Sequence, residues 1–228
     1  MIRRPIPSTI ATKMNIAPIY SFFQRRFRPK RVRALKLQFP LLDNPKATIL
    51  DVGGVASWWT DVKPATRAIT VINMDGEHES TCTAAGLKFM VADGRNLQFA
   101  DKQFDLAFSN SVIEHVGTLE DQRRFAAELV RCGKSVYVQT PARWFPVEPH
   151  LITVFIHWFP FSVTRRLVRW FSVWGWVYRP SQAAIDSFLR DIRLLNRQEV
   201  VSLFPGCQLQ YEKVLGMTKS FIVTRKEA

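Results

Sequence analysis

Residues 48–58 read Thr-Ile-Leu-Asp-Val-Gly-Gly-Val-Ala-Ser-Trp, and this stretch decides the fold. A short aliphatic run that is closed by glycine predicts a buried parallel strand ending in a tight loop. Gly53 and Gly54 let the backbone approach a ligand closely, and Asp51 offers a hydrogen-bond acceptor near the end of the strand. In an open α/β sheet, ligands bind at the carboxyl ends of the strands.

Three further strands are predicted downstream, and each of them ends in polar side chains. Asp75 follows Asp51 by 24 positions, close to the offset of roughly 20 residues at which a βαβ nucleotide site places a carboxylate on ribose hydroxyls. Aspartate is also a common turn former, so one such residue carries little weight. The polar strand ends are Asp75 with Gly76 after residues 68–74, Asp93 with Gly94 after residues 87–92, and Ser109 with Asn110 after residues 104–108.

The rest of the chain first continues the alternation of strands and helices and then departs from it. Residues 119–131 predict an amphipathic helix and residues 134–139 a fifth strand. Residues 142–180 then hold five of the seven tryptophans. Residues 181–204 return to helix, and residues 208–214 with 219–225 predict a final strand pair.

The charge of the chain indicates an anionic partner. The formal net charge is +13 over 228 residues, and residues 1–42 carry ten Lys or Arg and no acid. Such a surplus favours either nucleic acid or an anionic membrane surface. The three cysteines are scattered without a CxxC pair, which is typical of reduced thiols and argues against a disulfide frame or a zinc site.

The N-terminal region is predicted to be a basic arm followed by helix. Residues 19–39 form a helical stretch that Pro29 is expected to divide, because proline suits a first helical turn and not an interior. The stretch is either a solvated helix at the domain edge or an electrostatic docking arm. We expect residues 1–44 to be this arm and helix, and residues 45–228 to be one domain with an aromatic and basic insertion at 142–195.

The motifs together resemble the class I S-adenosylmethionine-dependent methyltransferases. The similar segments are ILDVGG (49–54), NMD (73–75), ADGRNLQFADKQFDLAFSNSVIEHV (92–116) and the strand at 134–140, with 92–116 the most specific. The resemblance implies an α/β, Rossmann-like, seven-stranded and mostly parallel sheet with an antiparallel final hairpin, helices on both faces, and a helical insertion after the fifth strand. It departs at Val55 and Ser57, which stand where the family has later glycines.

The same resemblance implies how S-adenosyl-L-methionine is bound. Gly53 and Gly54 would approach its amino-acid part, and Asp51 would accept from its amino group. Asp75, beside Gly76, would accept the ribose hydroxyls. Asp93 would accept a hydrogen bond from the adenine amine, with Gly94 and Arg95 beside it. Asn110, with Ser109, would line the floor of the site.

Two His–carboxylate pairs are candidate catalytic groups. An oxygen or nitrogen acceptor must lose a proton, and a histidine with a pKa near neutrality suits that task. Glu114-His115 follows the fourth strand, and Glu148-Pro149-His150 lies in a stiff loop beyond the fifth. Each pair could instead only cap or pack its segment. Similar quinone-biosynthesis O-methyltransferases bind a metal through Glu-x-x-Glu-His, but Ser111 replaces the first glutamate here, so no metal site is expected.

The aromatic segment bears on the acceptor. Residues 151–163 are too short to span a bilayer, which takes about 20 apolar residues. Thr164–Tyr178, taken as one helix, places Arg165, Arg166 and Arg169 on one face and residues such as Trp170 and Trp174 on the other, with Trp176 alone on the basic face. That pattern is typical of a helix at a membrane interface, and a lid over the active site is the alternative.

The leading prediction is a cytoplasmic methyltransferase, peripheral on the inner face of a membrane, that O-methylates a lipid-linked, glycolipid or quinone-type acceptor. A nucleic-acid methyltransferase would also explain the charge, but the Asn/Asp-Pro-Pro-aromatic run of base-amine methyltransferases is missing after Ser109. A non-catalytic binding module with this fold is a third possibility. A mitochondrial transit peptide is the lesser alternative for the basic N-terminus.

Overall fold

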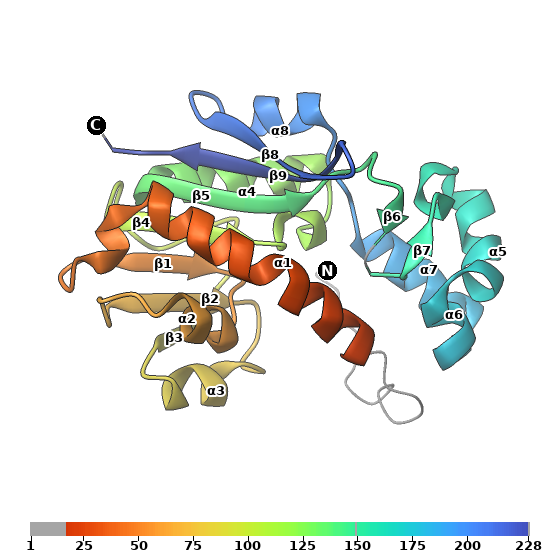
Figure 1. Cartoon of the computed structure of the whole chain (residues 1–228), viewed down its shortest axis with the longest axis horizontal. Coiled ribbons are helices and arrows are strands. Elements are labelled where there is room, and N and C mark those ends of the chain that lie inside the picture. The colour runs from red at the N-terminus through yellow and green to blue at the C-terminus, as the bar shows by residue number, and fades with distance from the viewer. Residues whose placement is uncertain (1–16, 149, 228) are drawn as a thin grey trace. The chain divides into compact units, whose positions relative to one another are not determined.

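The computed structural model describes residues 17–148 and 150–227, with side chains from residue 27 onward. The described chain forms two compact units (Figure 1). Residues 29–143 and 193–227 make one, here called the sheet unit, and residues 17–28 and 144–192 make the other, here called the insert unit. Residues 1–16 of the expected basic arm lie outside the described residues.

Within the described part of the sheet unit, seven strands pair in the order β3-β2-β1-β4-β5-β9-β8. β1 to β5 run parallel, and β9 is antiparallel to both β5 and β8. The predicted mostly parallel sheet with an antiparallel final hairpin is confirmed. The strands are β1 (Ile49–Val52), β2 (Ile69–Asn73), β3 (Lys88–Val91), β4 (Phe104–Asn110), β5 (Gly133–Pro141), β8 (Gln208–Val214) and β9 (Met217–Arg225).

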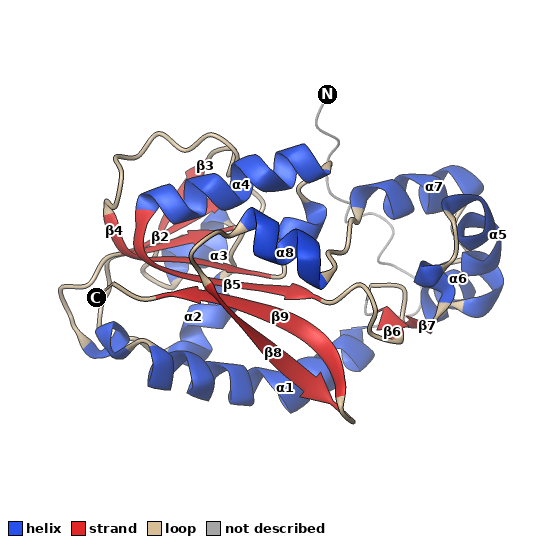
Figure 2. Cartoon of the chain, turned by 90° about the horizontal axis from the view of Figure 1, so that it is seen from above, coloured by secondary structure: helices blue, strands red, loops and turns tan. Residues whose placement is uncertain are grey.

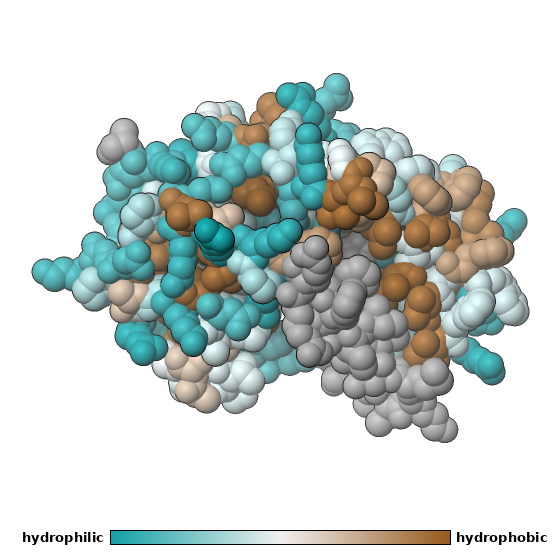
Figure 3. Space-filling view, in the orientation of Figure 1, coloured by the Kyte–Doolittle hydropathy of each residue, from teal (hydrophilic) through white to brown (hydrophobic). Residues whose placement is uncertain are grey.

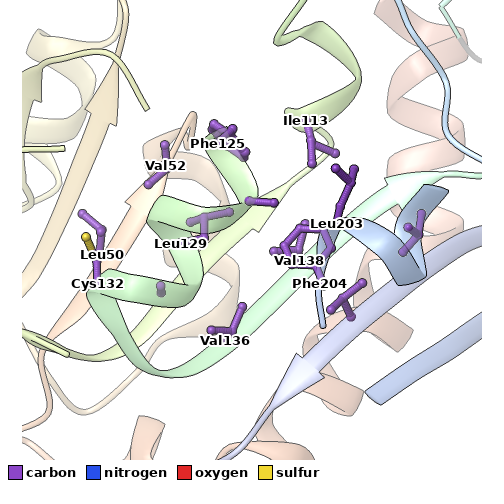
Figure 4. Close-up of a cluster of buried hydrophobic side chains, with 14 of the residues drawn as sticks. Leu50, Val52, Ile113, Phe125, Leu129, Cys132, Val136, Val138, Leu203 and Phe204 are labelled. Carbon is purple, nitrogen blue, oxygen red and sulfur yellow. The ribbon is translucent and has the colours of Figure 1, made fainter. Parts of the chain in front are cut away.

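Helices cover both faces of this sheet, as the view from above shows (Figure 2). α4 and α8 bury Phe125, Leu129 and Leu203 against one face, in the cluster drawn in Figure 4. α2 and the end of α1 bury Trp59, Leu35 and neighbouring side chains against the other. The bounds are α1 (Ala17–Gln38), η2 (Pro40–Asp43), α2 (Ala56–Val62), α3 (Glu79–Ala84), η3 (Ile113–His115), α4 (Leu119–Cys132) and α8 (Arg197–Leu203).

The division of the first helix that was expected at Pro29 is wrong. α1 runs through Pro29 without a break, although an interior proline removes one backbone hydrogen bond and costs about 3 kcal/mol. The turns after Pro29 are held by tertiary contacts, since Leu35 is fully buried and Arg31 pairs with Glu212 at 2.7 Å. Burial of one leucine contributes about 2 kcal/mol. The boundary between the two units falls between Arg28 and Pro29.

The insert unit has a hydrophobic core of its own. Buried side chains from its loops and helices meet there, among them Leu151, Val168, Trp174 and Phe188, with Trp174 stacked on Phe188 at a centroid distance of 4.9 Å. Its elements are β6 (Val147–Glu148), β7 (Thr153–Val154), η4 (Ile156–Trp158), α5 (Phe161–Phe171), α6 (Val173–Tyr178) and α7 (Gln182–Asp191).

The prediction of one helix from Thr164 to Tyr178 is also wrong. The helix breaks at Ser172, which has extended backbone angles, donates from Oγ to the Val168 carbonyl at 2.6 Å and caps α6 by accepting from the Gly175 amide. The break changes the faces. Trp174 is buried, whereas Trp176 lies exposed beside Trp170, to whose carbonyl its Nε1 donates.

Candidate active site

The polar strand ends predicted from the sequence lie along one edge of the sheet unit. β3, β2, β1 and β4 are successive parallel neighbours, so their carboxyl ends share an edge. Asp93, Asp75, Asp51 and Asn110 therefore follow one another along that edge in the order of the strands. This is the edge at which open α/β sheets bind ligands.

Asp51 is the most perturbed of these groups. Its side chain is fully buried, and Trp59 Nε1 donates to Oδ2 at 2.7 Å. Burial raises the pKa of Asp51 to about 7, with the Trp59 hydrogen bond opposing that shift. Within the described residues, Oδ1 is buried and has no hydrogen-bond partner. An uncommitted acceptor of this kind fits a ligand that brings an N–H donor.

The glycine loop that follows is closed around Asp51. A Cβ on Gly54 would lie 1.7 Å from Asp51 Oδ2, so a side chain cannot be accommodated there without moving the buried carboxylate. Gly53 has φ +80°, the left-handed region that favours glycine. The positions where the family has later glycines do not need them, because Val55 is extended (φ −136°) and Ser57 lies inside α2.

The end of β2 is tied to this loop by a residue that the sequence analysis missed. Asn73 Nδ2 donates to the Gly54 carbonyl at 2.9 Å. Two residues later, Asp75 is half-buried and its Oδ1 accepts from the Glu77 amide at 3.0 Å. The turn that includes Gly76 therefore fixes the Asp75 carboxylate at the edge. An asparagine that ends a strand could have been found as a loop-binding residue only by knowing the fold.

Asp93 is engaged within the protein. Both of its carboxylate oxygens accept from Arg95, at 2.6 to 3.0 Å, and Arg95 Nη1 also reaches Asp121 at 2.8 Å. The hydrogen bond from Arg95 is the largest of the effects that lower the pKa of Asp93, so the carboxyl is ionised. A Cβ on Gly94 would lie 2.7 Å from the Phe125 ring, which shows how closely this loop packs on α4.

Ser109 and Asn110 at the end of β4 differ in their surroundings. Ser109 is buried and its Oγ donates to the Val52 carbonyl at 3.0 Å, which joins β4 to β1. Asn110 Oδ1 is a buried atom without a hydrogen-bond partner among the described residues. Ser111 follows with φ +57°, a strained conformation for a residue with a side chain. Asn110 is thus better placed than Ser109 to meet a ligand.

Glu114 and His115 lie in η3, next to this edge. Glu114 is fully buried, its Oε2 accepts from Thr140 Oγ1 at 3.0 Å, and its backbone carbonyl accepts from the Arg193 amide at 2.7 Å. His115 is exposed. Buried Gln122 donates to the carbonyls of Ile113 and Arg193 and so fixes the same segment. Glu114 therefore holds the backbone that presents His115.

Glu148 and His150 form a hydrogen-bonded pair in the insert unit. His150 Nδ1 lies 2.6 Å from Glu148 Oε1, and the Leu151 amide donates to Oε2 at 2.6 Å. Glu148 is buried, which by itself would raise its pKa. The hydrogen bonds and charge of His150 outweigh burial, so the pKa of Glu148 is lowered. An ionised carboxylate that orients an imidazole is the arrangement of a general base.

The sheet order and the carboxylates along its edge define a Rossmann-like, nucleotide-binding α/β protein of the methyltransferase type. Residues 50–135 match the family model described as a methyltransferase domain. The chain carries a class I S-adenosylmethionine-dependent methyltransferase domain, and S-adenosylmethionine is its methyl donor.

Solved structures of low sequence identity share the fold. A magnesium protoporphyrin IX methyltransferase from Synechocystis PCC 6803, with bound S-adenosylhomocysteine, is 11% identical (TM-score 0.56), with 95% of this chain and 90% of that one covered. A methyltransferase from Thermotoga maritima is 14% identical (TM-score 0.51; 92% and 94% covered). One from Mesorhizobium loti is 13% identical (TM-score 0.51; 82% and 96%). The search of curated proteins gives no significant match.

Proposed function

We propose that this methyltransferase methylates a hydroxyl group of a lipid-linked acceptor at the surface of a membrane, on its cytoplasmic side. The observation that carries the proposal is the concentration of exposed aromatic side chains on the insert unit. Trp170, Phe171 and Trp176 are 66%, 65% and 70% exposed. Further exposed aromatics of this unit are Trp144, Phe155, Trp158, Phe159 and Phe161, and hydrophobic surface gathers over α5 and α6 in Figure 3.

The charges next to these aromatics suit an anionic surface. Arg166, Arg169 and Arg179 are exposed on the same two helices or directly after them. Tryptophan and phenylalanine favour the boundary between headgroups and acyl chains, and neighbouring cations attract anionic lipids by about 1 kcal/mol each. No helix in the described ranges is long and apolar enough to cross a bilayer, so contact would be at the surface.

The edge of the sheet unit is the proposed cofactor site. Asp51 Oδ1 and the glycine loop suit the amino group of the methionine part, and Asp75 suits the ribose hydroxyls. Asp93, Gly94 and Arg95 would border the adenine, and Asn110 the floor. Bound S-adenosylmethionine supplies an electrophilic methyl group, so the protein mainly positions the acceptor and removes its proton.

We assign proton removal to His150, with Glu148 as its positioning residue. His150 Nδ1 lies 2.6 Å from a buried, ionised carboxylate, which favours the tautomer with the proton on Nδ1 and so makes Nε2 the basic nitrogen of the ring. Removing a general base typically lowers the rate by about 10² to 10⁴. His150→Gln should therefore lower kcat by that factor, while His115→Gln changes it little. If kcat falls equally in the two variants, or falls only in His115→Gln, the assignment to His150 is refuted in favour of His115 in η3.

Liposome pelleting tests the membrane part of the proposal. We expect binding to vesicles that contain phosphatidylserine, and a loss of binding in the Trp170→Ser/Trp176→Ser double variant. Leu215→Ser is the matched control, since Leu215 is 92% exposed in the turn between β8 and β9 of the sheet unit. Binding to an oligonucleotide at the same salt, with no binding to vesicles, would refute the membrane assignment in favour of a nucleic-acid substrate.

The acceptor class is tested by mass spectrometry of lipid extracts from cells with and without the gene. Extracts from cells that express it should contain a lipid heavier by one CH₂ group. If the two extracts contain the same lipids, while the purified protein binds S-adenosylhomocysteine, the lipid acceptor is refuted. The methyltransferase assignment then stays in place.

A further inference from the structure

A group of charged and polar side chains lies beneath α1, on the face of the sheet opposite α4. Arg31 of α1 reaches across to the final hairpin, where its Nε and Nη2 donate to the Glu212 carboxylate at 3.2 and 2.7 Å. Lys219 of β9 donates to the same carboxylate at 3.3 Å. Two cations thus share one anion in a place where each of the three side chains is only 15% to 19% exposed.

The two cations at this place both pair with the Glu212 carboxylate. Burial, and after it the charge of Arg31, lowers the pKa of Lys219 to about 8, although Glu212 opposes the shift. A buried cation near a second cation is costly unless further negative charge is supplied. An anion brought by a ligand would supply that charge, and charge-assisted hydrogen bonds from Arg and Lys are the usual way in which proteins hold carboxylates and phosphates.

Two buried polar groups at the same place have no hydrogen-bond partner in the part of the chain that the structure describes. Gln139 Oε1 accepts from Ser111 Oγ at 2.8 Å and from Arg31 Nη1 at 3.4 Å, which fixes the orientation of the amide. Its Nε2 has no hydrogen-bond partner among the described residues, and neither has the hydroxyl of buried Tyr137, two residues earlier on β5. Buried polar groups normally have partners, so donors left over at one place point to a ligand.

The position of the cluster connects it with methyl transfer. Ser111 directly follows Asn110, and its backbone and side chain both bind Gln139. Lys219 lies at the carboxyl end of β5, where its carbonyl accepts from the Ala142 amide at 2.9 Å. The cluster therefore lies on the same edge of the sheet as the carboxylates that we assign to the cofactor.

We propose that Arg31, Gln139 and Lys219 form a binding site for an acidic group, a carboxylate or a phosphate, next to the methyl-transfer site. The inference rests on the proposed cofactor edge. The acidic group has two possible sources with this chemistry: the methionine carboxylate of the cofactor, or a carboxylate or phosphate of the acceptor.

Lys219→Met is the variant that tests the site, and Lys213→Met is its control on the same hairpin, since Lys213 is exposed and outside the cluster. In chloride buffer we expect Lys219→Met to unfold at the same temperature as the wild type or higher, because the folded protein disfavours the charge of Lys219. A lowered unfolding temperature would make Lys219 a structural bridge and would count against a ligand site.

Calorimetry with S-adenosylhomocysteine, 5′-methylthioadenosine and inorganic phosphate separates the sources. A loss of affinity of about tenfold or more for S-adenosylhomocysteine alone assigns the site to the methionine carboxylate, which 5′-methylthioadenosine lacks. Unchanged nucleoside affinities, with phosphate binding lost at constant ionic strength, assign it to the acceptor. If Lys219→Met matches Lys213→Met with all three ligands, the proposal is overturned. A wild type that binds neither nucleoside would instead refute the cofactor edge.

Discussion

The buried carboxyl of Asp51 allows a prediction in which stability and function move in opposite directions. Asp51→Asn keeps an oxygen that can accept from Trp59 Nε1 and removes the ionisable group. We expect the variant to be more stable than the wild type above neutral pH in the absence of ligand. We also expect it to lose S-adenosylhomocysteine affinity, because an amide cannot provide the negative charge that attracts an ammonium group.

The magnitude follows from the pKa of Asp51, which is about 7 in the folded protein against an ordinary value of 3.8. Between these values the folded state binds a proton that the unfolded chain has released, so stability falls as pH rises. One pKa unit corresponds to about 1.4 kcal/mol, so ionising the buried carboxyl costs the folded protein about 4 kcal/mol by pH 8. That is a large fraction of the 5–15 kcal/mol by which domains are typically stable.

Urea denaturation of both proteins between about pH 4 and pH 8 measures this cost. The other titratable groups are shared, so they cancel in the difference between the two free energies of unfolding. That difference should rise in favour of Asp51→Asn by about 1.4 kcal/mol per pH unit up to neutrality and then level off. A difference that stays constant across the range would refute the argument, since it would mean that the Asp51 carboxyl is not desolvated.

Four other substitutions test the glycine loop, the environment of Asp51 and the Glu148–His150 pair. Gly54→Ala, whose Cβ would lie 1.7 Å from Asp51 Oδ2, should cost about 1–3 kcal/mol of stability and weaken S-adenosylhomocysteine binding. Gly76→Ala, whose nearest contact would be 3.6 Å, should change stability by no more than about 0.5 kcal/mol; equal losses would contradict the close packing of the loop. Trp59→Phe removes the hydrogen bond that lowers the pKa of Asp51, so the fall in stability should extend to higher pH; a fall that ends at lower pH would contradict this. Glu148→Gln should lower kcat and shift the acidic limb of the pH–rate profile to lower pH, because His150 loses the anion that favours its protonated form; an unchanged profile would mean that Glu148 only supports the loop.

The sheet could be predicted from the sequence because its strands are short aliphatic runs that end in polar residues, and burial on both faces leaves few other structures for such runs. Asp51, Asp75 and Asp93 were predicted as cofactor-binding residues from the same pattern. The features that could not be predicted depend on tertiary contacts between residues that are distant in the sequence. Pro29 stays inside a helix because Leu35 and Arg31 hold the following turns, and Ser172 breaks a helix whose periodicity alone favours continuation. The contacts of Asn73 with the glycine loop and of Lys219 with Glu212 could be seen only in the folded structure.

The chain leaves the sheet unit after Arg143 and returns to it at Arg193, and these two points are adjacent. Ala142 and Leu195 form a parallel bridge, and the Arg143 amide donates to the Leu195 carbonyl at 3.0 Å. An insertion whose two ends are adjacent can be accommodated without distorting the strands next to it. The segment between these two points could therefore be replaced in evolution while the sheet stays the same. A different segment could allow a different acceptor to be methylated by the same methyl donor.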